Sequence, residues 1–130
     1  MPSQVVRMSV GTPNVITMAD DLEIIAFATV EQLWSWLERH HATHPGAWVE
    51  LQASRSAVAS IGFHDLLEAG IAYGWSESTR RAHDSTSYLQ KFTPRRTRGT
   101  TSERNIAIAI ADRLEGECRM TPAGRRALGR

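Results

Sequence analysis

Apolar residues recur with two different periods along this chain, and glycine or proline separates many of the segments. Three segments space apolar residues three or four positions apart, as on one face of a helix: 30–40, 63–73 and 103–115. Three others are short apolar or alternating runs of the kind found in strands: 22–28, 48–52 and 87–93. Both periods within 130 residues predict one α+β domain.

Capping residues mark where helices begin and end. Thr29, followed by Gln32, forms a capping box at the start of the first helix. Gly74 ends the second helix, and Thr121–Pro122 opens a short fourth one. We therefore expect about four helices.

The third helix is expected to begin at a cap formed by Thr101 or Ser102. Its apolar residues Ile106, Ile110 and Leu114 recur every four positions. We expect this stripe to face the core.

The strand segments predict a small antiparallel sheet of two to four strands. Residues 79–83 and 87–93 are expected to pair as a hairpin. Residues 1–20 show weak periodicity and are expected to form a flexible N-terminal extension, with a short strand at Val15–Met18 as one interpretation. The domain itself is expected to span residues 21–130.

The single cysteine, Cys118, excludes an intramolecular disulfide, which favours a reducing compartment. No apolar run approaches the roughly 18–20 residues that a membrane-spanning helix requires. The first residues also lack the continuous apolar region of a secretory signal peptide. We therefore expect a cytoplasmic protein without membrane insertion, and the sequence predicts no cofactor.

Charge is distributed unevenly along the chain, although the formal net charge is only +1. Residues 80–104 contain seven Lys or Arg and two Asp or Glu, giving 7 − 2 = +5. Residues 1–79 contain three and nine, giving 3 − 9 = −6, and residues 105–130 contain five and three, giving 5 − 3 = +2. Such asymmetry concerns the partners of a protein rather than its fold.

The basic segment is expected to form a surface that binds an anion. Its cations converge if the hairpin and the third helix pack side by side, and the helix N-terminus adds hydroxyls and free N–H groups. The expected ligand-binding residues are Trp75, Arg80, Tyr88, Arg95, Ser102 and Asn105. The alternative is a solvated basic rim with ordinary helix capping.

Three other kinds of site have less support. Nucleic-acid binding is disfavoured because the pI is only about 8.0. His40, His41 and His44 have a spacing that metal ligands use, but Pro45 follows at once and we expect no metal. Cys118 follows a helix end and is expected to be structural or incidental rather than catalytic.

Several motifs resemble those of one bacterial protein family. They are Ala72–Trp75 (AYGW), Ser87–Arg96 (SYLQKFTPRR), Ser102 with Asn105, and Arg119–Gly124 (RMTPAG). In this order and spacing they resemble the bacteriocin-protection, YdeI/OmpD-associated family, over roughly residues 22–124. The resemblance implies a compact α+β domain with a role in stress or bacteriocin tolerance, and it brings no established reaction.

The chain departs from that family at three points, one of which is the loop Ala53–Ala57, which holds only Arg55 where the family often has paired Lys. Ser76–Glu77 stand where the family usually has Ile-Asp, and Thr101 stands where it usually has Trp. A family property that depends on that Asp or Trp would be altered in this member.

Together these observations predict an accessory protein that binds an anionic ligand or an acidic partner without catalysing a reaction. One alternative is an enzyme that acts on an anionic small molecule, with Glu77 or Asp84 as its acid or base. A second alternative is a self-associating or partner-binding module, for which an exposed apolar patch would be the sign.

Overall fold

The structure, a computed structural model, describes residues 14–19, 22–53, 60–96 and 99–130. In chain order, the elements of these residues are β1 (Asn14–Ala19), β2 (Leu22–Ala26), α1 (Val30–His40), β3 (Ala47–Gln52), α2 (Phe63–Tyr73), β4 (Trp75–Ala82), β5 (Ser87–Pro94), α3 (Thr101–Gly116) and α4 (Pro122–Ala127). The expected α+β class in one small domain is confirmed. No helix of these residues combines the length and the apolar character needed to cross a membrane.

The five strands form one mixed sheet in the order β1-β2-β3-β5-β4. β2 and β3 run parallel, because α1 carries the chain back to the end of the sheet where β2 began. The other neighbouring pairs are antiparallel. The prediction of an antiparallel sheet with two to four strands is therefore wrong in two respects. The pairing of β2 with β3 is parallel, and the sheet has five strands. The strand considered at Val15–Met18 is present as β1, and the rest of the predicted extension lies outside the described residues.

The strand at the edge of the sheet, β4, begins directly after α2 and is longer than the predicted strand at 79–83. Gly74 permits this, because its left-handed conformation (φ 78°) ends α2 and redirects the chain within one residue. The predicted end of the second helix is confirmed, and the strand that follows it was not predicted to start so early.

Pairing between β4 and β5 contains a bulge. The register shifts between Glu77 and Arg80, where two residues of β4 lie opposite one residue of β5. Gln90 of β5 fills this irregularity, because its Nε2 donates to the carbonyl oxygens of Ser78 (3.0 Å) and Thr79 (3.3 Å). The side chain of Gln90 is buried, so its amide replaces backbone hydrogen bonds that the bulge interrupts.

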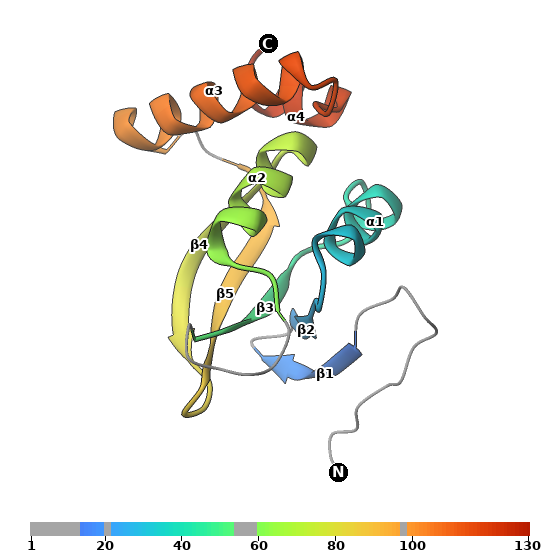
Figure 1. The fold of residues 1–130 in the computed structure, drawn as a ribbon, viewed down its shortest axis with the longest axis vertical. Coiled ribbons are helices and arrows are strands. Elements are labelled where there is room, and N and C mark those ends of the chain that lie inside the picture. The colour runs from blue at the N-terminus through green and yellow to red at the C-terminus, as the bar shows by residue number, and fades with distance from the viewer. Residues whose placement is uncertain (1–13, 20–21, 54–59, 97–98) are drawn as a thin grey trace.

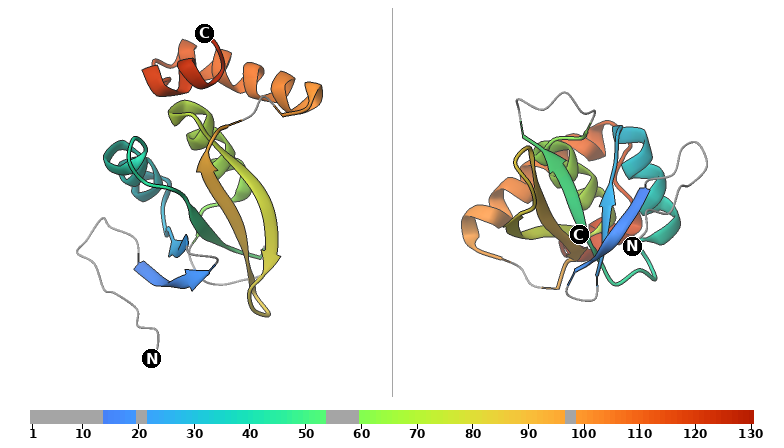
Figure 2. Two further views of the ribbon diagram at one scale, coloured as in Figure 1. Left: turned by 180° about the vertical axis from the view of Figure 1, so that it is seen from behind. Right: turned by 90° about the horizontal axis from the view of Figure 1, so that it is seen from below.

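The main core lies between one face of the sheet and the helices α1 and α2 (Figure 1; Figure 2). Val49 and Phe92 belong to this core, whereas Ile24, Trp48 and Leu89 form a smaller buried cluster. Successive residues of a strand point to opposite faces, so the neighbours Trp48 and Val49 belong to different clusters.

The two C-terminal helices cross the end of α2 (Figure 1). Thr121, the N-cap of α4, donates from Oγ1 to the carbonyl oxygen of Ala72 at 2.5 Å, and its backbone N–H donates to the same oxygen at 3.1 Å. These bonds fix α4 to the last turn of α2. They also set the position of α3, whose first half projects past α2 (Figure 2).

The start of α3 differs from the prediction by one residue. Thr100, rather than Thr101 or Ser102, is the N-cap. The Oγ1 of Thr100 accepts from the N–H of Glu103 (3.1 Å), and the Oε1 of Glu103 accepts from the N–H of Thr100 (2.9 Å). Glu103 stands three residues after Thr100, which completes a reciprocal capping box that neither predicted cap could form.

Candidate functional site

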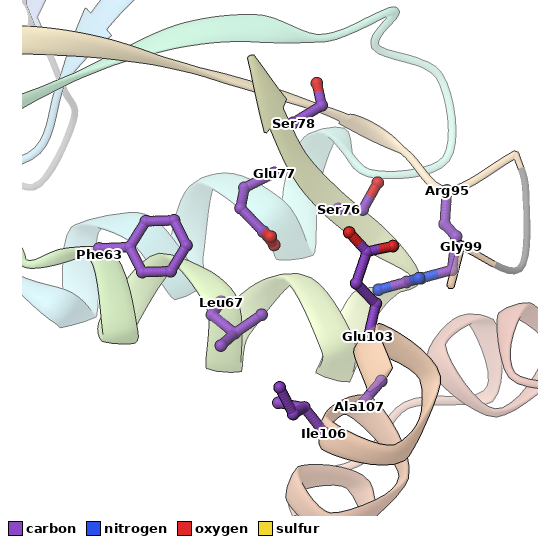
Figure 3. Close-up of a pocket in the computed structure, with 10 residues that line it drawn as sticks. All are labelled: Phe63, Leu67, Ser76, Glu77, Ser78, Arg95, Gly99, Glu103, Ile106 and Ala107. Carbon is purple, nitrogen blue, oxygen red and sulfur yellow. The ribbon is translucent and has the colours of Figure 1, made fainter. Parts of the chain in front are cut away.

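A pocket of about 420 Å³ opens between α2, β4 and the first half of α3 (Figure 3). Phe63 lies at one end, Arg95 and Gly99 lie at the other, and Glu77 lies between them (Figure 3). The lining residues are Phe63, Leu67, Ser76, Glu77, Ser78, Arg95, Gly99, Glu103, Ile106 and Ala107. The volume falls in the range of roughly 300–1,000 Å³ that is usual for small-molecule sites.

Among the described residues that line the pocket, Arg95 is the only cation. It follows Pro94 at the end of β5, and its backbone N–H donates to the carbonyl oxygen of Gly74 at 2.8 Å. Its Nε atom is buried and has no hydrogen-bond partner, and no described residue forms an ion pair with its guanidinium. A buried N–H group without a partner is uncommon, because its desolvation is not compensated.

Glu77 places a half-buried carboxyl group in the middle of the pocket. Glu77 of β4 lies directly opposite Phe92 of β5, whose side chain is fully buried. Glu77 therefore faces the interior side of the sheet. Burial raises the pKa of the Glu77 carboxyl above its usual value, and the nearby charge of Glu103 raises it further. The N–H of Glu77 itself and the guanidinium of Arg95 offset part of this increase.

The raised pKa predicts a pH-dependent effect of Glu77 on stability. Compared with the unfolded state, the folded state favours the protonated form, so stability is lost as pH rises from the unfolded pKa, about 4.3, through the folded pKa. Glu77→Gln should therefore raise the melting temperature at pH 7. The gain should disappear below about pH 4, where the carboxyl group is protonated in both states.

Melting curves of both proteins between pH 3.5 and pH 8 measure this difference. Glu31→Gln is the matched control, because Glu31 is exposed in the first turn of α1. A Glu77→Gln protein that is less stable than the wild type at pH 7 would contradict the assignment of a desolvated carboxylate.

The remaining wall of the pocket is apolar. Phe63 and Ile106, with 36% and 54% of their surface exposed, are the two exposed large hydrophobic residues among those that the structure describes. Both line the pocket, together with Leu67 and Ala107. The predicted inward stripe is thus wrong for Ile106, because the first half of α3 projects beyond the sheet, whereas Ile110 and Leu114 are buried as expected.

Residues 25–127 match a family model described as Domain of unknown function (DUF8412). The chain belongs to this family. The match covers the sheet from within β2 onward, all four helices and every residue that lines the pocket. No curated protein and no solved structure matches the chain. The resemblance to the YdeI/OmpD-associated family stays a prediction, because the DUF8412 match has no link to that family.

In this DUF8412 domain, Trp75 belongs to the core and not to a binding surface. Only 1% of its surface is exposed, and its indole Nε1 donates to the carbonyl oxygen of His41 at 3.2 Å. The rings of Trp36 and Phe92 lie 5.6 Å and 5.1 Å from it, measured between centroids. The expectation that Trp75 contacts a ligand is therefore wrong, because β4 begins at Trp75 and points its side chain inward.

The basic residues of the hairpin do not converge. The guanidinium of Arg80 lies 4.3 Å from the centre of the Tyr88 ring. Arg81 and Lys91 lie over the ring of Trp48, at 5.2 Å and 5.8 Å. Since Arg80 and Arg81 are consecutive in a strand, they point to opposite faces of the sheet. The predicted cationic surface is therefore divided between two faces, and neither Arg80 nor Tyr88 lines the pocket.

Ser102 and Asn105 were predicted to bind the ligand at the start of the third helix. Both are exposed on α3, and neither lines the pocket. Glu103, between them, does line it. Of the six predicted site residues the pocket contains Arg95, and it also contains Glu77 of the enzymatic alternative.

The second candidate acid or base, Asp84, lies in the turn between β4 and β5. Its Oδ1 accepts from the N–H of Thr86 (2.9 Å) and from the hydroxyl of Ser87 (2.8 Å). The hydrogen bond from the N–H of Thr86 contributes most to lowering the pKa of the Asp84 carboxyl, and the hydrogen bond from the Ser87 hydroxyl is second. Asp84 therefore remains ionised and stabilises the turn, apart from the pocket that contains Glu77.

One group of described residues has the composition of a cation site. Ligand atoms of Glu50, His83 and Asp84 lie within 4.8 Å of one another. The hydroxyl of Ser87 contacts both carboxylates, at 3.0 Å from Glu50 and 2.8 Å from Asp84. These contacts between β3 and the turn that joins β4 to β5 account for the arrangement.

The three clustered histidines take structural positions. His44 contacts Glu23 through Nε2 (2.8 Å), and its Nδ1 accepts from the N–H of Gly46 (3.1 Å). His41 bonds the carbonyl oxygen of Leu37 at the end of α1. Burial is the main cause that lowers the pKa of His40, which packs against Trp36. Cys118 is exposed beyond the end of α3.

Sequence reasoning missed most of the pocket, although one signal was present. Trp75 and Glu77 are two residues apart, so in a strand both point to one face. A strand that starts at Trp75 would have placed a carboxyl group beside a buried indole, which is unusual unless the group has a partner or a function. The apolar wall gave no such signal, because exposed and buried apolar residues look alike in a helical pattern.

Proposed function

We propose that this domain binds a small molecule that carries an acidic group and an apolar part. The acidic group pairs with the guanidinium of Arg95, and the apolar part contacts Phe63, Leu67 and Ile106. The observation that supports this most directly is the guanidinium itself, whose Nε is buried without a partner at one end of the pocket.

The energetics of the guanidinium favour a ligand with a carboxylate or phosphate group. A buried donor without a partner costs roughly 1–3 kcal/mol, and more when it is charged. A bidentate carboxylate or phosphate satisfies two guanidinium N–H groups at once. Such a ligand gives the guanidinium of Arg95 an anionic partner that no described residue provides, and the apolar wall adds burial of Phe63 and Ile106.

The experiment is a thermal-shift screen with carboxylates and phosphates that carry alkyl or phenyl groups. A ligand at a hundredfold excess over its Kd should add ~2.7 kcal/mol of stability to the wild type. Arg95→Gln should weaken binding by about tenfold or more, since it removes a charged hydrogen bond. Arg96→Gln is the matched control, because Arg96 is the exposed neighbour that does not line the pocket. Equal effects of the two variants would contradict the proposal.

A second candidate function is acid–base catalysis on the bound molecule. It is favoured by Glu77, whose carboxyl has a raised pKa within the same pocket. Mass spectrometry of each ligand recovered after incubation separates the two functions. An unchanged ligand supports binding alone, whereas a product that Glu77→Gln fails to form supports catalysis.

The wider role remains part of the proposal. We place the protein in the reducing cytoplasm, which the single cysteine favours. A part in stress or bacteriocin tolerance, implied by the resemblance to the YdeI/OmpD-associated family, stays a prediction. An acidic protein partner is less favoured than a small molecule, because the cations of the hairpin are divided between two faces of the sheet.

A further inference from the structure

We infer that the ligand also carries a basic group next to its acidic one, and is a zwitterion of the amino-acid type with an apolar side chain. The inference rests on the proposed function and adds the chemical class of the ligand. It follows from the charges of the pocket and from the order in which the polar and apolar groups lie along it (Figure 3).

The charges of the pocket do not suit a simple anion. Among the described residues, the lining includes one cation, Arg95, and two carboxyl groups, Glu77 and Glu103, which give 1 − 2 = −1 when all are ionised. A ligand with one negative charge would lower the total charge to −2 in a partly enclosed space. A ligand that adds an ammonium group beside Glu77 and Glu103 leaves the total at −1 and gives each charge an opposite neighbour.

Both carboxyl groups retain capacity to accept from a cation. Glu103 uses Oε1 to cap the backbone of Thr100, and no described residue donates to its Oε2. No described residue other than Glu77 itself donates to the Glu77 carboxyl, and no described Lys or Arg lies in ion-pair distance of it. An ammonium group has three donors, so it can contact both carboxyl groups together.

The order of groups along the pocket matches one end of an amino acid. Arg95 and Glu103 lie at one end and Phe63 lies at the other, with Glu77 and Leu67 between (Figure 3). A carboxylate at Arg95 places the adjacent ammonium group near Glu103 and Glu77. The side chain then extends along the apolar wall toward Phe63.

Two matched sets of probes test the inference. The first is L-phenylalanine, 3-phenylpropionate, which lacks the amine, and 2-phenylethylamine, which lacks the acid. The second is L-leucine, 4-methylpentanoate and 3-methylbutylamine, which differ in the same way. Calorimetric titration of the untagged protein should give an affinity for the better zwitterion at least about tenfold above both of its truncated forms.

Substitutions identify which residue of the pocket binds which group of the ligand. Glu77→Gln should lower the affinity for the zwitterion by about tenfold. The affinity for the matching carboxylic acid should stay the same or increase. Arg95→Gln should lower the affinity for both compounds, and Glu31→Gln should change neither affinity. Unfolding does not explain a loss in Glu77→Gln, because that variant is expected to be the more stable protein at neutral pH.

The outcomes separate the inference from the proposed function. If the carboxylic acids bind as tightly as the zwitterions, or if Glu77→Gln weakens both alike, the inference is wrong and the proposed function stands. If no compound of either set binds and the wider screen of carboxylates and phosphates also gives no shift, both are wrong.

Discussion

Replacing Trp75 by alanine will destabilise the domain by about 3–5 kcal/mol, as is usual when a large aromatic side chain is removed from a core. Trp75 packs between Trp36 and Phe92, so the cavity would lie between α1 and the sheet. The carbonyl oxygen of His41 would also lose its hydrogen bond from the indole. Small domains have only about 5–15 kcal/mol of stability in total, so this loss is large.

Urea unfolding followed by circular dichroism measures the effect without relying on tryptophan fluorescence. Trp34→Ala is the matched control, because Trp34 is only partly buried and packs against Tyr73 and Arg119. The control should lose clearly less stability than Trp75→Ala. A loss under about 1 kcal/mol for Trp75→Ala would contradict its place in the core and restore it as a candidate surface residue.

Gly124→Ala should destabilise the protein by more than about 2 kcal/mol, or release α4 from α2. A Cβ atom at Gly124 would overlap the carbonyl oxygen of Ala72 and would lie 2.5 Å from that of Ile71. Both are backbone atoms of α2, so no side chain can rotate away to make room. Thr121 would then lose its two hydrogen bonds to Ala72, which hold the start of α4.

Gly116→Ala is the matched control for this substitution. A Cβ atom at Gly116 would meet no atom within 4 Å, and Gly116 is the last residue of α3. Alanine favours a helix over glycine by up to about 1 kcal/mol, so the control should be neutral or stabilising. Thermal melts of the two variants provide the comparison, and equal melting temperatures would contradict the close contact at Gly124.

Local signals in the sequence predicted the helices well. Thr29 and Gly74 stand at the helix boundaries where capping chemistry places them, and the bounds of α2 are those expected. The parallel pairing of β2 with β3 was missed. Whether two strands pair parallel or antiparallel depends on the end of the sheet to which α1 returns the chain. The residues of the strands themselves do not indicate this.

The binding site was less predictable than the fold. Arg95 was identified from the basic segment around it, but the other cations of that segment point to different faces. The pocket instead depends on how far α3 projects past α2, which the distant contact of Thr121 with Ala72 determines. Composition along the chain cannot show such a tertiary contact, and a run of like charges does not by itself define one surface.

The bulge in β4 has a consequence for the behaviour of the protein at high concentration. β4 is an edge strand, and regular edge strands can pair with a second chain and start aggregation. The irregular stretch at Ser78 and Thr79, held in place by Gln90, disrupts the spacing of the free N–H and C=O groups on that edge. Arg80 and Arg81 follow immediately and add like charges that repel a second copy. This edge of the sheet is therefore protected against intermolecular strand addition by its own geometry.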